Sequence, residues 1–282
     1  MAHSTRENPF DLDGYLERIG WQGPRRADAD TLRGLHLAHL RAIPFENLDA
    51  LAGRAPSLDP EDLTAKLVRG RRGGYCYEHN TLFARALRAL GFGVTLLAAR
   101  VVVGADRIED RPRTHMALLV EAPGTPEPYL ADVGFGAIGS LLEAVPLRAD
   151  TEFHDAGRRH RLTRTPHGGP LDLWLLQAWT GESWQGQYAF TPEPFAESDY
   201  EVFNWHVATN PRSPFSRRPY VQRLTPRGHL LLDGDRLVET RDDGTVTERK
   251  LTGDDEARRV VEAEFGLDVP AGLVLLRGAR AS

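Results

Sequence analysis

The chain has 282 residues, of which 41% are hydrophobic and 27% charged, a composition typical of globular proteins with room for about two or three modest domains. Its net charge of −5 argues against nucleic-acid binding, and no apolar run approaches the roughly 20 residues that a membrane-spanning helix needs. The first eight residues lack the apolar core of a secretory signal, and the only cysteine cannot form an intramolecular disulfide, so we expect a cytoplasmic protein.

The first ninety residues show an apolar spacing typical of helices. Apolar residues recur three and four positions apart in the segments 12–19 and 32–40. Asp59 and Pro60 have the identities favoured at the N-cap and the first position of a helix. The last helix of this block is expected at about 76–91, where an apolar stripe ends at a glycine.

From about residue 93 the apolar period changes from 3.6 to 2, which is typical of strands. Loops rich in glycine, proline and charge separate the strand-like segments, which predicts an antiparallel sheet or a small barrel. The predicted strands lie at 94–103, 114–120, 129–133, 171–178 and 184–190. Residues 148–170, rich in histidine, arginine and glycine, are expected to form a long loop without an assigned role.

Beyond about residue 194 the pattern is mixed. Asp-Gly pairs at 233–234 and 243–244 are typical of tight turns between strands, and a helix is expected at about 254–265. The predicted strands of this part lie at 219–224, 228–232, 236–240 and 245–251. The changes of period therefore indicate a helical part, a β part and a mixed C-terminal part, with borders near residues 92 and 193.

The only cysteine, Cys76, occupies a position where a thiol gains reactivity. It follows the glycine pair of the run Arg72-Gly-Gly-Tyr-Cys-Tyr-Glu-His-Asn80 and directly precedes the predicted helix at 76–91. The positive end of a helix dipole favours the thiolate and so nucleophilic attack. Two glycines allow the backbone to turn sharply and to approach a ligand closely.

A histidine and an aspartate lie on two of the predicted strands. His115 belongs to the strand at 114–120 and Asp132 to the strand at 129–133, and the loop between these strands is centred near residue 124. A hairpin folded there would place His115 within a residue or two of the position opposite Asp132, so that the carboxylate can accept from one imidazole nitrogen. The other nitrogen could then face a thiol, and the three residues would supply a nucleophile, its base and the group that orients the base.

Each of these residues also has a structural interpretation. Cys76 fits a small buried hydrophobe, His115 a strand histidine with satisfied hydrogen bonds, and Asp132 a residue that caps a turn. The combination favours a function, because an aspartate in an apolar strand needs a partner and His115 is the nearest candidate. Since Cys76 comes from the helical part and the other two come from the β part, the expected site spans a domain boundary.

Four short segments occur together in this chain. They are Ile43-Pro-Phe-Glu-Asn-Leu-Asp49, the run around Cys76, Thr114-His-Met116 and Ala131-Asp-Val-Gly-Phe-Gly136. In this order and spacing they resemble the arylamine N-acetyltransferases, and the resemblance covers the whole chain. It implies an α+β fold with a papain-like Cys-His-Asp core and three domains. These would be an N-terminal helical bundle at 1–92, a central antiparallel β-barrel at 93–193 and a C-terminal α/β lid at 194–282.

The resemblance also implies a reaction. Cys76, His115 and Asp132 would form the catalytic triad, with acetyl-CoA as co-substrate and no bound cofactor. Attack of the thiolate on acetyl-CoA would release CoA, and an arylamine or arylhydrazine would then take the acetyl group in a ping-pong reaction. Backbone N–H groups near Cys76 are the natural source of the oxyanion hole. The resemblance implies a role in xenobiotic metabolism for a monomer or homodimer that binds neither nucleic acid nor a membrane.

Further positions match contact residues of that family. Thr114, Gly134, Phe135 and Gly136 match positions beside the donor, although a strand end followed by a tight turn would explain them equally well. Arginines between 212 and 223 are candidate partners for the phosphates of CoA, and the alternative is a solvated, arginine-rich loop.

Two positions match the acceptor side of the family's site, Phe45 and Val103, and Phe215 is counted with the residues that contact the donor. Phe45 resembles the aromatic wall for the acceptor, with core packing as the alternative. Phe215 matches an aromatic residue of the lid near the entrance for CoA and the acceptor. Val103 lies, with the two valines before it, in the region that lines the acceptor pocket, and these residues offer no polar group.

Two other pairs are interpreted as structural. Arg72 and Glu46 resemble family positions that form an internal ion pair. His36 and His39 lie three residues apart on a predicted helix, but no third ligand accompanies them, so we expect surface histidines and no metal site.

Three other functions stay open on the sequence. An amide synthase of the same fold would act in aromatic natural-product biosynthesis, and a cysteine hydrolase would let water attack the acyl-enzyme. A pseudoenzyme would only bind CoA or an aromatic ligand, and the presence of all three triad residues argues against it.

Overall fold

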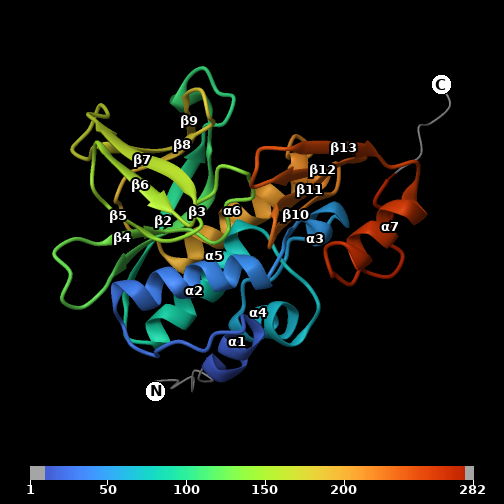
Figure 1. Ribbon diagram of the computed structural model, residues 1–282, viewed down its shortest axis with the longest axis horizontal. Coiled ribbons are helices and arrows are strands. Elements are labelled where there is room, and N and C mark those ends of the chain that lie inside the picture. Colours follow the sequence, from blue (N-terminus) through green and yellow to red (C-terminus); the bar gives the residue numbers. More distant parts are fainter. Residues whose placement is uncertain (1–9, 277–282) are drawn as a thin grey trace.

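The structure is a computed structural model that describes residues 10–276 (Figure 1). Residues 1–8, considered above for a secretory signal, lie outside the described residues. Helices, an eight-stranded sheet and a five-stranded sheet make up the described part. None of the helices within residues 10–276 combines the length and the apolar character that crossing a lipid bilayer requires.

The N-terminal part is rich in helices, as its apolar spacing predicts. The helices are α1 (Leu12–Arg18), α2 (Ala29–Ala42), α3 (Leu48–Leu51), α4 (Pro60–Leu63) and α5 (Cys76–Ala89), with a π-helical turn at Thr64–Arg69 after α4. Aspartate side chains cap α1, α2 and α4. The carboxylate of Asp59 accepts a hydrogen bond from the N–H of Glu61 at 2.9 Å, and Pro60 takes the first helical position, as predicted.

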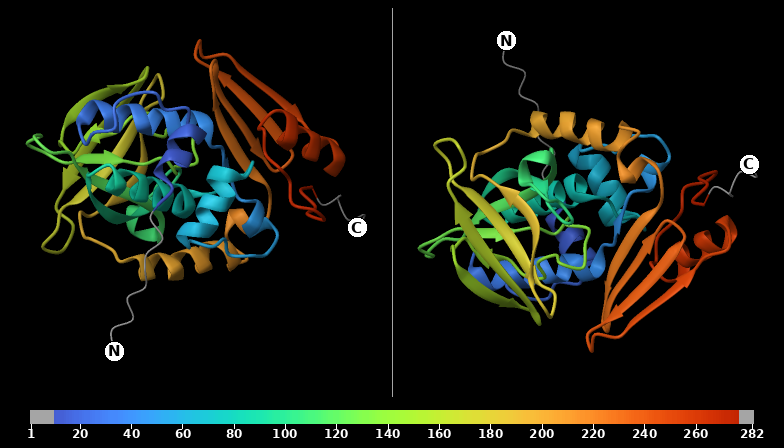
Figure 2. Two further views of the ribbon diagram at one scale, coloured as in Figure 1. Left: turned by 90° about the horizontal axis from the view of Figure 1, so that it is seen from below. Right: turned by 90° about the horizontal axis from the view of Figure 1, so that it is seen from above.

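The central part is an antiparallel sheet with the spatial order β5-β4-β3-β2-β9-β8-β7-β6. It curls until it is nearly closed like a barrel (Figure 2). Its strands are β2 (Gly93–Val101), β3 (Arg113–Glu121), β4 (Tyr129–Ala131), β5 (Val145–Pro146), β6 (Thr151–Asp155), β7 (Arg158–Thr165), β8 (Leu173–Trp179) and β9 (Trp184–Phe190).

The expectation of a long loop at 148–170 is wrong, because β6 and β7 form an antiparallel hairpin there. Only His160 and Leu162 of β7 are buried, and arginines flank them on the sequence. The charged residues therefore hid the alternation that identifies a strand.

The C-terminal part forms a second antiparallel sheet with the order β1-β10-β11-β12-β13. Its elements are β10 (Tyr220–Thr225), β11 (Gly228–Asp233), β12 (Arg236–Arg241), β13 (Val246–Lys250) and the helix α7 (Asp254–Ala263). The predicted turns at 233–234 and 243–244 connect β11 to β12 and β12 to β13, which confirms the strand pattern of this part.

The other elements that were not expected from the sequence include one strand and one helix. The edge strand β1 (Phe45–Glu46) comes from the N-terminal part, where only helices were predicted, and its Phe45 pairs with Gln222 of β10. The helix α6 (Glu197–Thr209) connects the two sheets, and Val202 and Trp205 on it are each 63% exposed. Apolar residues on its solvent side removed the periodicity that predicts a helix.

In Figure 1, α1, α2 and α4 lie below the two sheets, and α5 reaches the central sheet, where it packs against β2 and β3. One apolar cluster continues from α1, α2 and α5 into β2, β3 and β4, and it includes Cys76. The borders expected near residues 92 and 193 coincide with the change from α5 to β2 and with the segment before α6. The division into three domains stays a prediction, since β1 joins the N-terminal part to the last sheet.

Candidate active site

Cys76 is the first residue of α5, and only 4% of its surface is exposed. The helix starts here because Tyr75 is extended, with φ −107° and ψ −169°, and because the Glu78 carboxylate accepts a hydrogen bond from the Tyr75 N–H at 3.1 Å. The thiol therefore lies at the positive end of the dipole of α5, as the sequence predicts.

Gly73 and Gly74 lead into α5 through a space that admits no side chain. A Cβ on Gly73 would overlap the carbonyl oxygen of Pro44, and a Cβ on Gly74 would lie 2.7 Å from the Glu78 carboxylate. The carbonyl of Gly74 accepts a hydrogen bond from the N–H of Glu46 in β1 at 2.8 Å. The glycine pair therefore allows two backbone segments to approach each other next to Cys76.

The hairpin of β3 and β4 brings His115 and Asp132 together. Leu118 pairs with Ala131 across the hairpin, so His115 and Asp132 lie diagonally on one face of the sheet. The distance from His115 Nε2 to Asp132 Oδ2 is 2.7 Å, and the two side chains are 3% and 0% exposed.

Two groups lie near the Cys76 thiol, the carbonyl of Thr114 and the imidazole of His115. The carbonyl oxygen of Thr114 lies 3.9 Å from Sγ, which is long even for sulfur, and Cys76 contributes to the raised pKa of the His115 imidazole. Because Asp132 occupies Nε2 of His115, Nδ1 is the nitrogen left for the thiol.

The electrostatics of this trio favour a charged imidazole. Burial by itself lowers the pKa of His115, but the charge and hydrogen bond of Asp132, with the contribution of Cys76, raise it to about 10. Burial by itself raises the pKa of Asp132, but His115 and hydrogen bonds from Asn80 and the Gly134 N–H hold it below its usual range. An imidazolium at neutral pH can pair with a thiolate.

Asn80 contacts this trio and was given no role from the sequence. Its amide donates to Asp132 Oδ1 at 2.9 Å and to the carbonyl of Met116 at 2.7 Å, and it accepts from the Val133 N–H at 3.1 Å. Asn80 lies four positions after Cys76 on α5, and this spacing, which places both residues on one helix face, was the signal available.

The expectation that His36 and His39 lie on a helix surface is wrong, since both are 0% exposed. His36 Nε2 accepts from the Asp132 N–H at 3.0 Å, and its Nδ1 donates to the carbonyl of Leu142 at 2.9 Å. His39 lies 2.8 Å from His79 of α5, and burial lowers the pKa of all three histidines. They are hydrogen-bonded core histidines, and residues 10–276 contain no cluster of acidic, histidine or cysteine residues placed to hold a metal ion.

The residues predicted beside the donor surround the trio. The ring of Phe135 lies edge-on to His115 with centroids 5.1 Å apart. A Cβ on Gly134 would lie 2.6 Å from Cys76 Cα, and a Cβ on Gly136 would lie 2.8 Å from the ring of Phe45. The glycines at 134 and 136 therefore let this loop pass between Cys76 and Phe45, next to His115.

Aromatic side chains from separate parts of the chain meet beside this loop. The ring of Phe45 lies 5.8 Å from Phe215 and 5.9 Å from Tyr220, and Phe215 lies 6.0 Å from Tyr75, all between centroids. The structure thus brings Phe45, predicted for the acceptor wall, next to Phe215, predicted near the entrance for CoA and the acceptor. Tyr220 belongs to the same group and was not singled out from the sequence.

The remaining predicted contacts lie further out. Val103 is 38% exposed on the turn after β2. Arg212 and Arg217 are exposed, whereas Arg218 is paired with Asp233. Contacts of these side chains with a substrate stay a prediction.

The predicted ion pair of Arg72 and Glu46 is present, at 2.7 Å, and belongs to a larger network under α5. Lys66 lies 2.6 Å from both Asp49 and Glu78, and Asp49 also pairs with Arg72 at 3.0 Å. Burial raises the pKa of Glu78 to about 7, although Lys66 acts in the opposite direction. The network holds the segment before Cys76 against β1 and α3.

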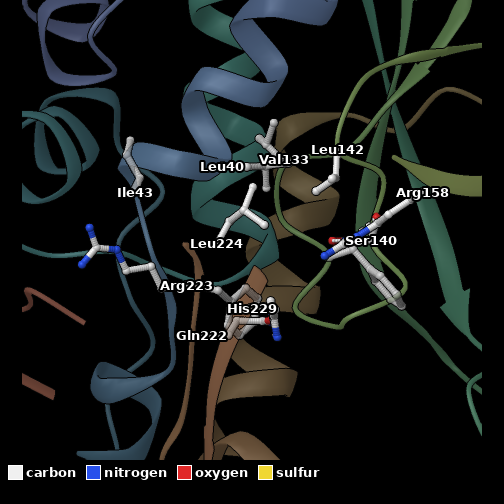
Figure 3. A pocket seen from close by; sticks show the side chains of 12 residues that line it. Leu40, Ile43, Val133, Ser140, Leu142, Arg158, Gln222, Arg223, Leu224 and His229 are labelled. Carbon is white, nitrogen blue, oxygen red and sulfur yellow. Dashed lines mark hydrogen bonds between the residues drawn. The ribbon is translucent and has the colours of Figure 1, made fainter. Parts of the chain in front are cut away.

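A cavity of about 30 Å³ lies between the loop after β4, the end of α2 and the strands β10 and β11 (Figure 3). Its volume holds about two water molecules. Leu40, Val133 and Leu142 line it from one side, and His229 and Gln222 from another. Since it is too small for an aromatic ring and Cys76 does not line it, we do not assign it to a substrate.

Comparisons with known proteins agree with this geometry. A family described as N-acetyltransferase matches residues 28–274. The arylamine N-acetyltransferase of Mycolicibacterium smegmatis is 42% identical over 92% of this chain and 93% of its own length, and that of Escherichia coli is 38% identical over 92% and 89%.

Solved structures give the same result. The arylamine N-acetyltransferase of Nocardia farcinica superposes with a TM-score of 0.88 at 42% identity, covering 95% of this chain and 94% of that one. The Mycobacterium marinum arylamine N-acetyltransferase in complex with CoA superposes with a TM-score of 0.84 at 36% identity, covering 91% and 93%. The chain therefore belongs to the arylamine N-acetyltransferase family of acyltransferases, as its four sequence segments predict.

Proposed function

We propose that this protein transfers an acetyl group from acetyl-CoA to the nitrogen of an arylamine or arylhydrazine through an acetyl-Cys76 intermediate. The observation that carries the proposal is the buried trio of Cys76, His115 and Asp132. Cys76 lies at the start of α5, and the Asp132 carboxylate lies 2.7 Å from the His115 imidazole. Family membership and the CoA complex of the relative from Mycobacterium marinum support acetyl-CoA as the donor.

In the first half-reaction the Cys76 thiolate attacks the thioester carbonyl of acetyl-CoA. A bond forms between Sγ and the acetyl carbon, the bond from that carbon to the CoA sulfur breaks, and the proton of the His115 imidazolium passes to the departing CoA thiolate. Asp132 keeps the imidazole oriented and stabilises its charged form before this transfer. Backbone N–H groups near Cys76 would stabilise the oxyanion.

In the second half-reaction the amine attacks acetyl-Cys76. A bond forms between nitrogen and the acetyl carbon, His115 takes the proton of the amine, and Cys76 leaves as a thiolate beside the regenerated imidazolium. CoA departs before the amine reacts, so the kinetics are ping-pong. Phe45, Phe215 and Phe135 provide flat apolar surfaces for an aromatic acceptor.

The proposal places the enzyme in the cytoplasm, as a monomer or homodimer, in xenobiotic metabolism. The donor site includes Thr114, Gly134, Phe135, Gly136 and Phe215, and Val103 contributes to the outer part of the acceptor site.

Release of CoA from acetyl-CoA tests the proposal when it is measured with an arylamine, with an arylhydrazine and without an acceptor. Without an acceptor we expect one CoA to be released per chain, and with an acceptor we expect catalytic release. Intact-protein mass spectra should show a mass increase of about 42 Da, which corresponds to one acetyl group on Cys76. Catalytic release without acceptor would instead identify a hydrolase, and no release at all a binding protein. Activity only with larger acyl thioesters would identify an amide synthase.

A further inference from the structure

The side-chain amide of Asn47 makes three hydrogen bonds, all of them to one segment of the C-terminal part. Its Nδ2 donates to the carbonyls of Phe215 and Arg218, each at 2.8 Å, and its Oδ1 accepts from the N–H of Tyr220 at 2.7 Å. Asn47 is 2% exposed and directly follows β1, so these hydrogen bonds join the N-terminal part to the segment 215–220. This segment carries two of the three rings that meet at Phe45.

Tyr220 continues this connection into the central sheet region. Its hydroxyl donates to the carbonyl of Gly136 at 2.7 Å, while its ring packs against Phe45 and Phe215. Gln222, two residues further on the same face of β10, also packs on Gly136, since a Cβ there would lie 2.6 Å from its Nε2. The segment from β10 therefore lies directly on the loop after Asp132.

That loop packs against two of the residues assigned to the reaction. Phe135 packs against the imidazole of His115, and Gly134 packs against the backbone of Cys76. A movement of Gly136 would therefore change the space next to the acyl group on Cys76. Within residues 10–276, the Tyr220 hydroxyl is the one side-chain group that donates a hydrogen bond to the Gly136 carbonyl.

We propose that Asn47 and Tyr220 are positioning residues for the acceptor half of the reaction. Asn47 sets the backbone of 215–220, and Tyr220 fixes that segment to Gly136, so that Phe45, Phe215 and Tyr220 form one rigid wall for the ring of the amine. This inference rests on the proposed acetyl transfer. It assigns the pair to acceptor binding and not to formation of the acyl-enzyme.

The test replaces Tyr220 with phenylalanine, which keeps the ring and removes only the hydrogen bond to Gly136. Tyr200→Phe is the control, because the hydroxyl of this buried tyrosine has no partner among the described residues. We expect Tyr220→Phe to raise the KM for the arylamine about three- to tenfold, the value of one hydrogen bond. At saturating acetyl-CoA, formation of acetyl-Cys76 in a single turnover should stay within about twofold of the wild type.

A second measurement needs no transferase activity. Alkylation of Cys76 by N-phenyl-iodoacetamide is compared with alkylation by iodoacetamide, and we expect the preference for the aryl reagent to fall about threefold or more in Tyr220→Phe but not in Tyr200→Phe. Asn47→Asp, which keeps the acceptor for Tyr220 N–H and removes the two donated hydrogen bonds, should act in the same direction. Its folding is checked by the melting temperature.

The outcomes separate the two proposals. An unchanged amine KM together with an unchanged alkylation preference in Tyr220→Phe overturns the positioning role. An equal loss in acyl-enzyme formation and in acceptor turnover also overturns it, because the pair would then act on the triad. If the wild type releases no CoA, the proposed function fails, and the alkylation preference alone decides whether Asn47 and Tyr220 shape the wall.

Discussion

Replacing Asp132 with asparagine tests the electrostatic role of the trio with almost no change in shape. Asp132 Oδ1 accepts hydrogen bonds from Asn80 Nδ2 and from the Gly134 N–H, each at 2.9 Å, so the oxygen of the new amide must take this position. Its NH₂ group then faces His115 Nε2, where the carboxylate oxygen Oδ2 lay at 2.7 Å. Two donors cannot face each other, so the imidazole must carry its proton on Nδ1, toward Cys76.

The expected loss of turnover in Asp132→Asn follows from the pKa of His115. Burial opposes the imidazolium, and Asp132 together with a smaller contribution of Cys76 outweighs burial to raise the pKa from 6.5 to about 10, which corresponds to roughly 5 kcal/mol in favour of the charged imidazole. Without the carboxylate, the imidazole is neutral and in the tautomer that cannot accept the thiol proton. In a serine-protease triad the same replacement lowers turnover about 10⁴-fold, and we expect a loss of about 10³- to 10⁴-fold here.

The assay is CoA release with an arylamine, combined with nitrogen NMR of the imidazole to locate its proton. The hydrogen bonds of Asn80 and Gly134 persist, so the melting temperature should stay near that of the wild type, and Asp243→Asn, at an exposed turn, is the control for the loss of a carboxylate. Turnover within about tenfold of the wild type, or a proton still on Nε2, would refute this reasoning.

Three further predictions concern the same region. Cys76→Ser should keep the fold and lose transfer entirely, because a hydroxyl is far less acidic than a thiol; a CoA burst from this variant would contradict the nucleophile assignment. The raised pKa of His115 means that its stabilising contribution is complete below pH 6.5 and is lost as the pH rises toward 10, so the unfolding free energy from urea titrations should fall over this range by more in the wild type than in Asp132→Asn. Gly73→Ala should destabilise the protein by about 1–3 kcal/mol or more, because its methyl group overlaps a backbone carbonyl, whereas Gly169→Ala, which meets only a carbonyl oxygen at 3.6 Å, should have little effect.

The sequence predicted the parts of the site that depend on local structure. The start of α5 at Cys76 follows from a glycine pair and an apolar stripe, and the His115–Asp132 contact follows from the length of one hairpin loop. Both features involve residues within a short stretch of chain. Periodicity and turn residues describe such stretches well.

The features that could not be predicted from the sequence depend on residues far apart in the chain, or on an apolar alternation that charged residues obscure. The burial of His36 is set by hydrogen bonds to Asp132 and Leu142, about a hundred positions away, and a helical spacing gives no sign of them. The position of Tyr220 depends on the hydrogen bond from its N–H to Asn47, which lies 173 positions earlier in the chain. The hairpin of β6 and β7 was hidden by the arginines on its exposed face.

The strand β1 has a consequence for the order in which the protein folds. Its partner β10 is synthesised when most of the chain has already left the ribosome, and the contact between Asn47 and Tyr220 closes a loop of 173 positions. The helices and the central sheet rest on contacts nearer in sequence and can form earlier. Until the last strands pair with β1, the ring of Phe45 lacks its neighbours Phe215 and Tyr220. During refolding, helical circular dichroism should therefore recover before arylamine acetylation does, and the nascent enzyme stays inactive until its C-terminal sheet is complete.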